Sequence, residues 1–273
     1  MSEFTLGKYM SKPSELQKPD QILLMGPYGG GKTYLAASAS LVPELRKVLI
    51  IDTEGSTVGT TANFDDEHLH ILNIREQAKK LSKDKGVEIH PVQFFELVMD
   101  QVFEHEEQYG TVVIDALDRL NDMYLDYTES QAELEASGAI NAFYKWTETR
   151  DLLTSHRGLI QKMKDASFLS ILVMHEQEDE NTGRIDFAWT GKGARSDLGG
   201  IPDLVMRVTR VYDERSKDWT TKLVSAPTKK GQAKSRFNKI PEVIEDAVTM
   251  ADLWNYLESD NKKNKKNTEK EVK

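Results

Sequence analysis

Short runs of Ile, Leu, Val and Met alternate along the chain with segments whose apolar residues recur every three or four positions. The runs are bounded by turn residues and predict strands at 22–25, 48–52, 69–74, 111–115 and 168–175. Nearly continuous apolar runs of this kind are typical of strands buried on both faces of a parallel sheet. Helical patterns lie between them, at 33–41, 91–107 and 139–166. The alternation predicts an α/β fold, with a mainly parallel sheet flanked by helices.

The pattern changes after residue 201. Two apolar runs, 204–212 and 219–224, flank a polar turn and predict a C-terminal antiparallel hairpin. A short helix is expected near 249–257, where Thr249 and Asp252 have the spacing of a capping box. We therefore expect five parts: an N-terminal segment (1–21), a core (22–242) that includes the hairpin (204–224) and a basic segment (227–240), a C-terminal helix (243–260), and a disordered basic tail (261–273).

Composition narrows the class of protein. The 273 residues are 38% hydrophobic, and no apolar run approaches the length of a membrane span. The first residues lack the apolar stretch of a secretory signal, and the absence of cysteine excludes disulfides and Cys-ligated zinc. We expect a cytoplasmic protein with no membrane partner.

The formal charge of −9 is unevenly distributed. Residues 96–135 hold twelve acidic side chains and one basic one, whereas residues 219–241 hold six basic side chains and no acidic one. The tail is basic too. A net acidic chain argues against nucleic acid as a partner, but the segment-by-segment distribution leaves a basic end that could contact phosphates.

One motif carries specific chemistry. The sequence G-x-x-x-x-G-K-T follows the first predicted strand and precedes an Ala-rich helix, which is where a phosphate-binding loop must lie. The expected nucleotide-binding residues are Gly26, Pro27, Tyr28, Gly29, Gly30, Gly31, Lys32, Thr33 and Tyr34. Lys32 would neutralise the β- and γ-phosphates, and the Thr33 hydroxyl would bind Mg²⁺. ATP and Mg²⁺ are therefore the expected ligands.

Two further strand ends complete the predicted site. Asp115 ends the strand 111–115, where it could hold the magnesium ion beside Thr33. Position 116 is Ala, so no carboxylate follows that Asp directly, and Glu54 after strand 48–52 is the candidate for aligning or deprotonating the attacking water. His175 stands at the tip of strand 168–175, where it would sense the γ-phosphate or serve only a structural role.

The sequence Asp52-Thr-Glu-Gly55 also fits the D-x-x-G signature of GTP-binding proteins. A guanine-specific site would need Asn-Lys-x-Asp after a late apolar strand, and the chain has His175-Glu-Gln there instead. This makes a GTPase the weaker interpretation.

Together, GPYGGGKT, KVLIIDTEGS, TVVIDALDRL and FLSILVMHEQ resemble the core of RecA-like P-loop ATPases, and most closely the phage-encoded group that includes single-strand-annealing recombination proteins. The resemblance covers about residues 22–242. It implies Mg²⁺-dependent ATP hydrolysis, with Glu54 catalytic, Asp115 at the metal and His175 at the sensor position. It also implies assembly as a homo-oligomer, a ring or filament, on single-stranded DNA.

The resemblance assigns DNA contacts to the segment after the sensor strand. There the candidates are Arg184, Phe187, Trp189, Lys192 and Arg195, a mixture of stacking and phosphate-binding side chains. It also places basic residues after the hairpin near the ATP of a neighbouring subunit. Lys229, Lys230, Lys234 and Arg236 are the candidates, either as fingers supplied in trans or as DNA contacts.

Two other functions stay open from the residues alone. A nucleotide or small-molecule kinase would need an Arg-rich lid, and Arg195, Arg207 and Arg210 are the nearest approach to one. A nucleotide-gated interaction module with little turnover would keep ATP binding without needing Glu54.

Overall fold

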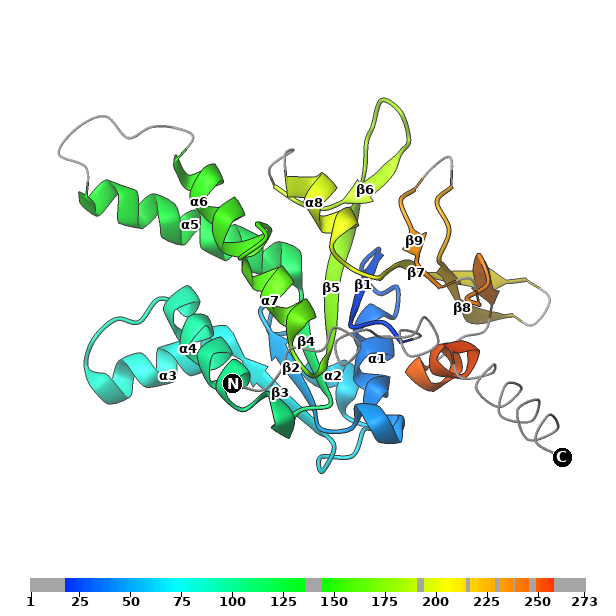
Figure 1. The fold of residues 1–273 in the computed structure, drawn as a ribbon, viewed down its shortest axis with the longest axis horizontal. Helices are drawn as coiled ribbons and strands as arrows, with labels where there is room; N and C mark the ends of the chain where they lie inside the picture. Colours follow the sequence, from blue (N-terminus) through cyan, green and yellow to red (C-terminus); the bar gives the residue numbers. More distant parts are fainter. Residues whose placement is uncertain are drawn as a thin grey trace, which may run out of the picture.

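The structure is a computed structural model, and it describes residues 18–135, 144–190, 194–214, 217–228, 231–237, 239–245 and 249–257. The predicted disordered tail, Lys192, Lys229 and Lys230 lie outside the described residues. The strands are Gln21–Gly26 (β1), Val48–Asp52 (β2), Leu69–Asn73 (β3), Thr111–Asp115 (β4), Leu169–Glu178 (β5), Ile185–Phe187 (β6), Leu204–Asp213 (β7), Asp218–Val224 (β8), Lys234–Ser235 (β9) and Val243–Glu245 (β10) (Figure 1).

The helices are Lys32–Ala37 (α1), Val58–Thr61 (α2), Ile74–Lys85 (α3), Pro91–Glu104 (α4), Leu117–Glu135 (α5), Tyr144–Leu153 (α6), Leu159–Asp165 (α7) and Ala194–Gly200 (α8), with 3₁₀ turns at Ser38–Leu41 (η3), Pro43–Leu45 (η4) and Glu106–Gln108 (η5). A further helix spans 250–257. As predicted, Thr249 caps it: its backbone N–H and its hydroxyl both donate to the Asp252 carboxylate, at 2.8 and 2.9 Å.

The sheet has the order β10-β8-β7-β1-β5-β4-β2-β3. From β7 to β3 all neighbours are parallel, whereas β7–β8 and β8–β10 are antiparallel. The fold-class prediction is therefore confirmed: a mainly parallel sheet flanked by helices, with an antiparallel hairpin toward the C-terminus. Parallel pairing brings the carboxyl ends of β1, β2, β4 and β5 to one edge, which is where open α/β sheets bind ligands.

Each face of the sheet has its own apolar core, because side chains of a strand point alternately to opposite faces. Leu23 and Met25 of β1 pack with α4, α5 and α7, whereas Ile22 and Leu24 pack with α1 and the 250–257 helix. All four side chains are fully buried. At roughly 1.5–3 kcal/mol for each buried large apolar side chain, the two cores hold β1 rigidly behind the phosphate loop.

Three elements differ from the sequence predictions. The acidic segment 117–135 forms the long helix α5, whose apolar positions Leu117, Leu120 and Tyr124 are spaced by three and four and are buried. The predicted helix over 139–166 is divided in its described part, because α6 ends at Leu153 and α7 begins at Leu159. Residues 243–245, expected to be helical, form β10 on the edge of the sheet. No helix in the described part of the chain is long and apolar enough to cross a membrane.

Candidate active site

The phosphate loop joins β1 to α1, as predicted (Figure 1). Gly29 and Gly31 have φ angles of 70° and 93°, a region that favours glycine. A Cβ on Gly26 would collide with the carbonyl oxygen of Val208 on β7, and one on Gly30 would lie 2.9 Å from the same atom. The glycines therefore allow the turn and also the close approach of β7 to the loop.

Lys32 begins α1 and is 5% exposed. Its Nζ donates to the carbonyl oxygens of Gly26 and Pro27, at 3.0 and 2.8 Å. Burial lowers the pKa of the Lys32 ammonium, and the carboxylates of Asp115 and Asp118 oppose this shift. The ammonium thus lies at the mouth of the loop, where bound phosphate oxygens could replace the two carbonyls as its partners.

The magnesium ligands predicted from the sequence do lie together. The Thr33 hydroxyl donates to Asp115 Oδ2 at 2.6 Å. Burial, together with the neighbouring charges of Asp52 and Glu54, raises the pKa of Asp115 to about 6, although the Thr33 hydrogen bond and the Lys32 charge act to lower it. The Asp115 carboxylate is buried with too little positive charge around it, and the Thr33 hydroxyl oxygen lies beside it. Two oxygen ligands in this arrangement fit Mg²⁺.

Glu54 follows β2 in a turn that Asp52 holds: Asp52 Oδ1 accepts the backbone N–H groups of Glu54 and Gly55, at 3.0 and 2.6 Å. Thr53 links this turn to β4, since its hydroxyl donates to the carbonyl oxygen of Ala116 at 2.8 Å and accepts the Ala116 N–H at 3.0 Å. These bonds fix the spacing between Glu54 and the end of β4.

The Glu54 carboxylate is paired with Arg119 of α5. Arg119 Nε donates to Glu54 Oε1 at 3.0 Å, and its Nη2 donates to the Tyr28 hydroxyl at 2.6 Å. This hydrogen bond from Arg119 to Glu54 is the main cause that raises the pKa of the guanidinium. Arg119 is therefore a bridge between the catalytic candidate and the phosphate loop.

His175 ends the part of β5 that pairs with β1 and is 6% exposed. One carboxylate holds it twice: Asp118 Oδ1 accepts its backbone N–H at 3.1 Å, and Asp118 Oδ2 lies 3.0 Å from Nδ1. The Tyr28 ring stacks on the imidazole with centroids 3.9 Å apart, and Glu54 Oε1 lies 3.8 Å from Nδ1. The histidine therefore joins the phosphate loop, the catalytic candidate and α5.

A cavity of about 660 Å³ contains these groups. It is lined by Tyr28, Gly29, Gly30, Gly31, Lys32, Thr33, Tyr34, Glu54, Ser56, Thr60, Asn63, Asp115, His175, Arg210 and Thr221. The size suits a nucleotide-sized ligand. The predicted residues 28–34, Glu54, Asp115 and His175 all face this one space.

Sequence reasoning missed several residues of this site, among them Asp118, Arg119, Arg210 and Thr221. Asp118 and Arg119 follow the strand that ends in Asp115 by three and four residues, so the sequence could have predicted that they lie close to the site. Arg210 and Thr221 carried no such signal, because their place depends on how the hairpin folds over the loop.

The predicted DNA segment after β5 is corrected in part. Phe187 and Trp189 are 0% and 2% exposed, because β6 pairs back onto β5 and turns both rings into the core. They offer no stacking surface. Arg195 donates to the Trp189 carbonyl oxygen at 3.2 Å and lies 3.7 Å from Asp186, whereas Arg184 is exposed.

The basic segment is also turned inward where the structure describes it. Lys234 Nζ donates to the carbonyl oxygens of Gly199, Gly200 and Pro202, at 3.1, 2.8 and 2.8 Å. Arg236 pairs with Asp203 at 2.7 Å. Both cations therefore bind loop carbonyls and a carboxylate of their own chain, and neither extends outward as a finger for a neighbouring subunit.

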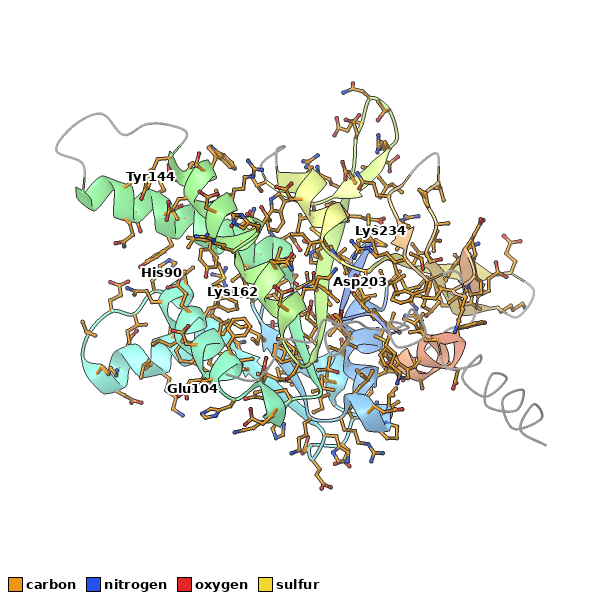
Figure 2. All side chains as sticks on the ribbon, in the orientation of Figure 1. His90, Glu104, Tyr144, Lys162, Asp203 and Lys234 are labelled. Atoms are coloured by element: carbon orange, nitrogen blue, oxygen red, sulfur yellow. The ribbon has the colours of Figure 1, made fainter. Side chains whose placement is uncertain are left out.

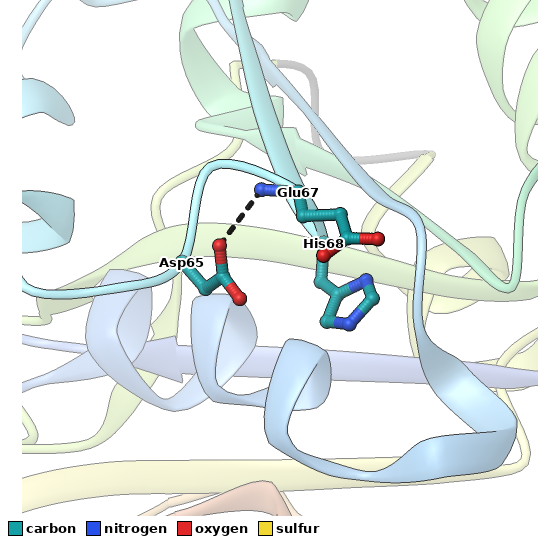
Figure 3. A group of neighbouring side chains, drawn as sticks. All are labelled: Asp65, Glu67 and His68. Carbon is teal, nitrogen blue, oxygen red and sulfur yellow. Dashed lines mark hydrogen bonds between the residues drawn. The ribbon is translucent and has the colours of Figure 1, made fainter.

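Asp65, Glu67 and His68 form a separate group on the turn before β3 (Figure 3). Their ligand-type atoms lie within 4.8 Å of one another, but the two carboxylates are exposed and Asp65 Oδ1 accepts the Glu67 N–H at 3.0 Å. We interpret the group as a turn held by its own hydrogen bonds.

Comparison with known proteins gives the following. No curated protein matches the chain. Among solved structures, the RadB recombinase is similar at 14% identity and a TM-score of 0.38, over 83% of this chain and 86% of that one. An ATPase from the type III secretion system of pathogenic bacteria is similar at 10% identity and a TM-score of 0.41, over 69% of this chain and 52% of that one.

A family match is more extensive. Residues 18–237 match the AAA domain family, a range that includes every residue lining the cavity. Since the match spans most of the chain, this protein belongs to the AAA domain family of P-loop ATPases.

Proposed function

We propose that the chain is a magnesium-dependent ATPase that binds single-stranded DNA and acts in phage-type homologous recombination or strand annealing, as a ring or filament of identical subunits. One observation carries the ATPase activity: the phosphate loop, Glu54 and the Thr33–Asp115 pair line the same cavity. A kinase remains the alternative if phosphate is transferred to a nucleotide rather than released, and product analysis separates the two.

In the proposed reaction Lys32 and the loop N–H groups hold the β- and γ-phosphates. Thr33 and Asp115 would hold Mg²⁺, which neutralises charge on the phosphate oxygens. Glu54 orients water and accepts its proton while the water oxygen bonds to the γ-phosphorus. The bond from that phosphorus to the bridging oxygen breaks, and ADP leaves with the electron pair.

The Arg119–Glu54 pair bears on turnover. Arg119 Nε donates to Glu54 Oε1, so this oxygen cannot accept a hydrogen bond from water along the same direction until the ion pair opens. This observation favours the nucleotide-gated module as the second candidate. An assay of phosphate release distinguishes them: an ATPase releases phosphate and stops when Glu54 is changed to Gln, whereas a module binds ATP and functions equally well with either residue.

The DNA proposal is supported by charge. Residues 219–241 hold six basic side chains and no acidic one in a chain with a net charge of −9, although two of the six, Lys234 and Arg236, bind groups of their own chain. Arg184, with Lys192, Lys229 and Lys230, is the remaining candidate for phosphate contact. The test is a titration of labelled single-stranded DNA with and without ATP at several salt concentrations. Affinity should fall as salt rises; no binding at low salt in either state rejects the proposal. Particle images under the same conditions test for rings or filaments.

A further inference from the structure

The β7–β8 hairpin carries an exposed aromatic pair. Tyr212 and Trp219 face each other in the strand register, and their rings meet at 62° with centroids 5.5 Å apart. The two residues are 46% and 55% exposed. Aromatic side chains about half exposed on a hairpin are a surface suited to a flat ligand.

The register places this pair beside the nucleotide cavity. Side chains of directly opposed residues share a face, and the face repeats every second residue. Val208 and Leu223 are buried in the core on this face, Arg210 and Thr221 come next and line the cavity, and the aromatic pair follows. The pair lies four residues beyond Val208, about 13 Å further along the strand at 3.3 Å per residue.

The sheet order gives the direction of a bound nucleotide. Three residues expected to face the γ-phosphate come from strands on one side of β1: Glu54 follows β2, Asp115 ends β4, and His175 ends the part of β5 that pairs with β1. The β7–β8 hairpin lies on the other side, because β7 pairs with the edge of β1 opposite β5 (Figure 1). A nucleotide with its terminal phosphate toward β5 and its middle phosphates in the loop has its base end on the side away from β5.

We propose that Tyr212 and Trp219 form a nucleobase-binding subsite, against which the base of the bound nucleotide stacks. Arg210 and Thr221 lie between this subsite and the phosphate loop. The inference rests on the proposed nucleotide binding and deepens it. Stacking accepts any base, so the pair favours nucleotides over bare polyphosphate without selecting adenine over guanine.

The test compares ADP with inorganic pyrophosphate by calorimetry on the full chain with Mg²⁺, since neither probe is consumed. Replacing both aromatics (Tyr212→Ala with Trp219→Ala) should weaken ADP and GDP binding roughly tenfold and leave pyrophosphate binding unchanged. The conservative pair Tyr212→Phe with Trp219→Phe should keep ADP affinity. Tyr144→Ala is the matched control, because Tyr144 is 39% exposed on α6, away from the hairpin (Figure 2).

A second readout does not need the alanine variant to fold. ADP should change the tryptophan fluorescence of the wild-type chain, and Trp219→Phe should remove that change. The inference is overturned if ADP and pyrophosphate affinities move together or not at all in the double variant. It is also overturned if only DNA binding or self-association is lost, or if Tyr34→Ala alone abolishes the preference for ADP. A wild-type chain that binds neither probe contradicts the proposed function instead.

Discussion

The sequence contains two groups of charged residues with predicted functions, those at the strand ends and those in the basic segment, and they have different roles in the folded protein. At the carboxyl edge of the sheet, Lys32, Glu54 and Asp115 come from separate segments and face one cavity. In the basic segment, Lys234 and Arg236 fold back onto residues 199–203 of their own chain, at the end of α8 and just after it. The same residue types thus serve chemistry in one place and architecture in the other. The physical reason is that side chains at the carboxyl ends of parallel strands face a cavity. The basic segment instead lies against backbone carbonyl oxygens, which need hydrogen-bond donors.

Glu54→Gln gives the largest expected effect on the first group. Loss of a general base should lower kcat about 10²- to 10⁴-fold, while ADP affinity and melting temperature stay close to wild type. Phosphate release under saturating ATP measures it. Glu67 is an exposed carboxylate on the turn of Figure 3, and Glu67→Gln should leave kcat, ADP affinity and melting temperature unchanged. Unchanged turnover in Glu54→Gln would remove Glu54 from the catalytic group.

Asp203→Asn should show the opposite pattern. Asp203 is buried, which raises its pKa, but hydrogen bonds from Lys164 and the Asp20 N–H together with the charge of Arg236 hold that pKa below its usual 3.8. Asp203→Asn removes the carboxylate charge that Lys164 and Arg236 share. This should destabilise the protein by about 3 kcal/mol at pH 7 and leave kcat unchanged.

The effect of Asp203 should depend on pH. A depressed folded-state pKa stabilises the protein above the unfolded value, and this is lost as pH falls through the folded value. The difference in unfolding free energy between Asp203→Asn and wild type should therefore be constant from pH 7 to 5 and shrink below about 3.8. Asp197→Asn, which removes a more exposed pair with Arg150, is the control and should cost less than about 1 kcal/mol. A pH-independent difference would contradict the assignment.

Asp118→Asn should have a moderate effect, because Asp118 acts through His175 as a positioning residue. Loss of the charged acceptor should lower kcat about tenfold with little change in KM. A double-mutant cycle is the readout: in a His175→Gln background, Asp118→Asn should have no further effect on kcat. Additive effects would assign Asp118 a separate structural role.

Lys234→Met gives the smallest effect. Losing three hydrogen bonds from a partly exposed ammonium should cost about 1 kcal/mol of stability and leave ATPase activity within about twofold of wild type. A loss of activity near 10³-fold, with stability intact, would instead restore the finger role and erase the contrast between the two groups.

Much of the fold was predictable from local patterns. The strands around residues 48–52 and 111–115 lie where the apolar runs predict them, since a buried strand needs an unbroken apolar run whatever its neighbours are. Helix α5 was missed although its apolar spacing was present, because its high acidic content was interpreted only as charge. The break between α6 and α7 depends on packing around Gly158, whose added Cβ would lie 2.7 Å from Leu153 backbone atoms.

The sequence by itself determined the phosphate loop and the catalytic and metal candidates, because a motif and strand ends place those residues whenever the strands are parallel. Only the tertiary structure decided what the aromatic and basic residues do. It buried Phe187 and Trp189, turned Lys234 inward and left Tyr212 and Trp219 exposed beside the cavity. All of these depend on how β5 pairs with β6 and how β7 pairs with β8 and β9. Such pairings set which way each side chain points, and a shift of one residue would reverse it.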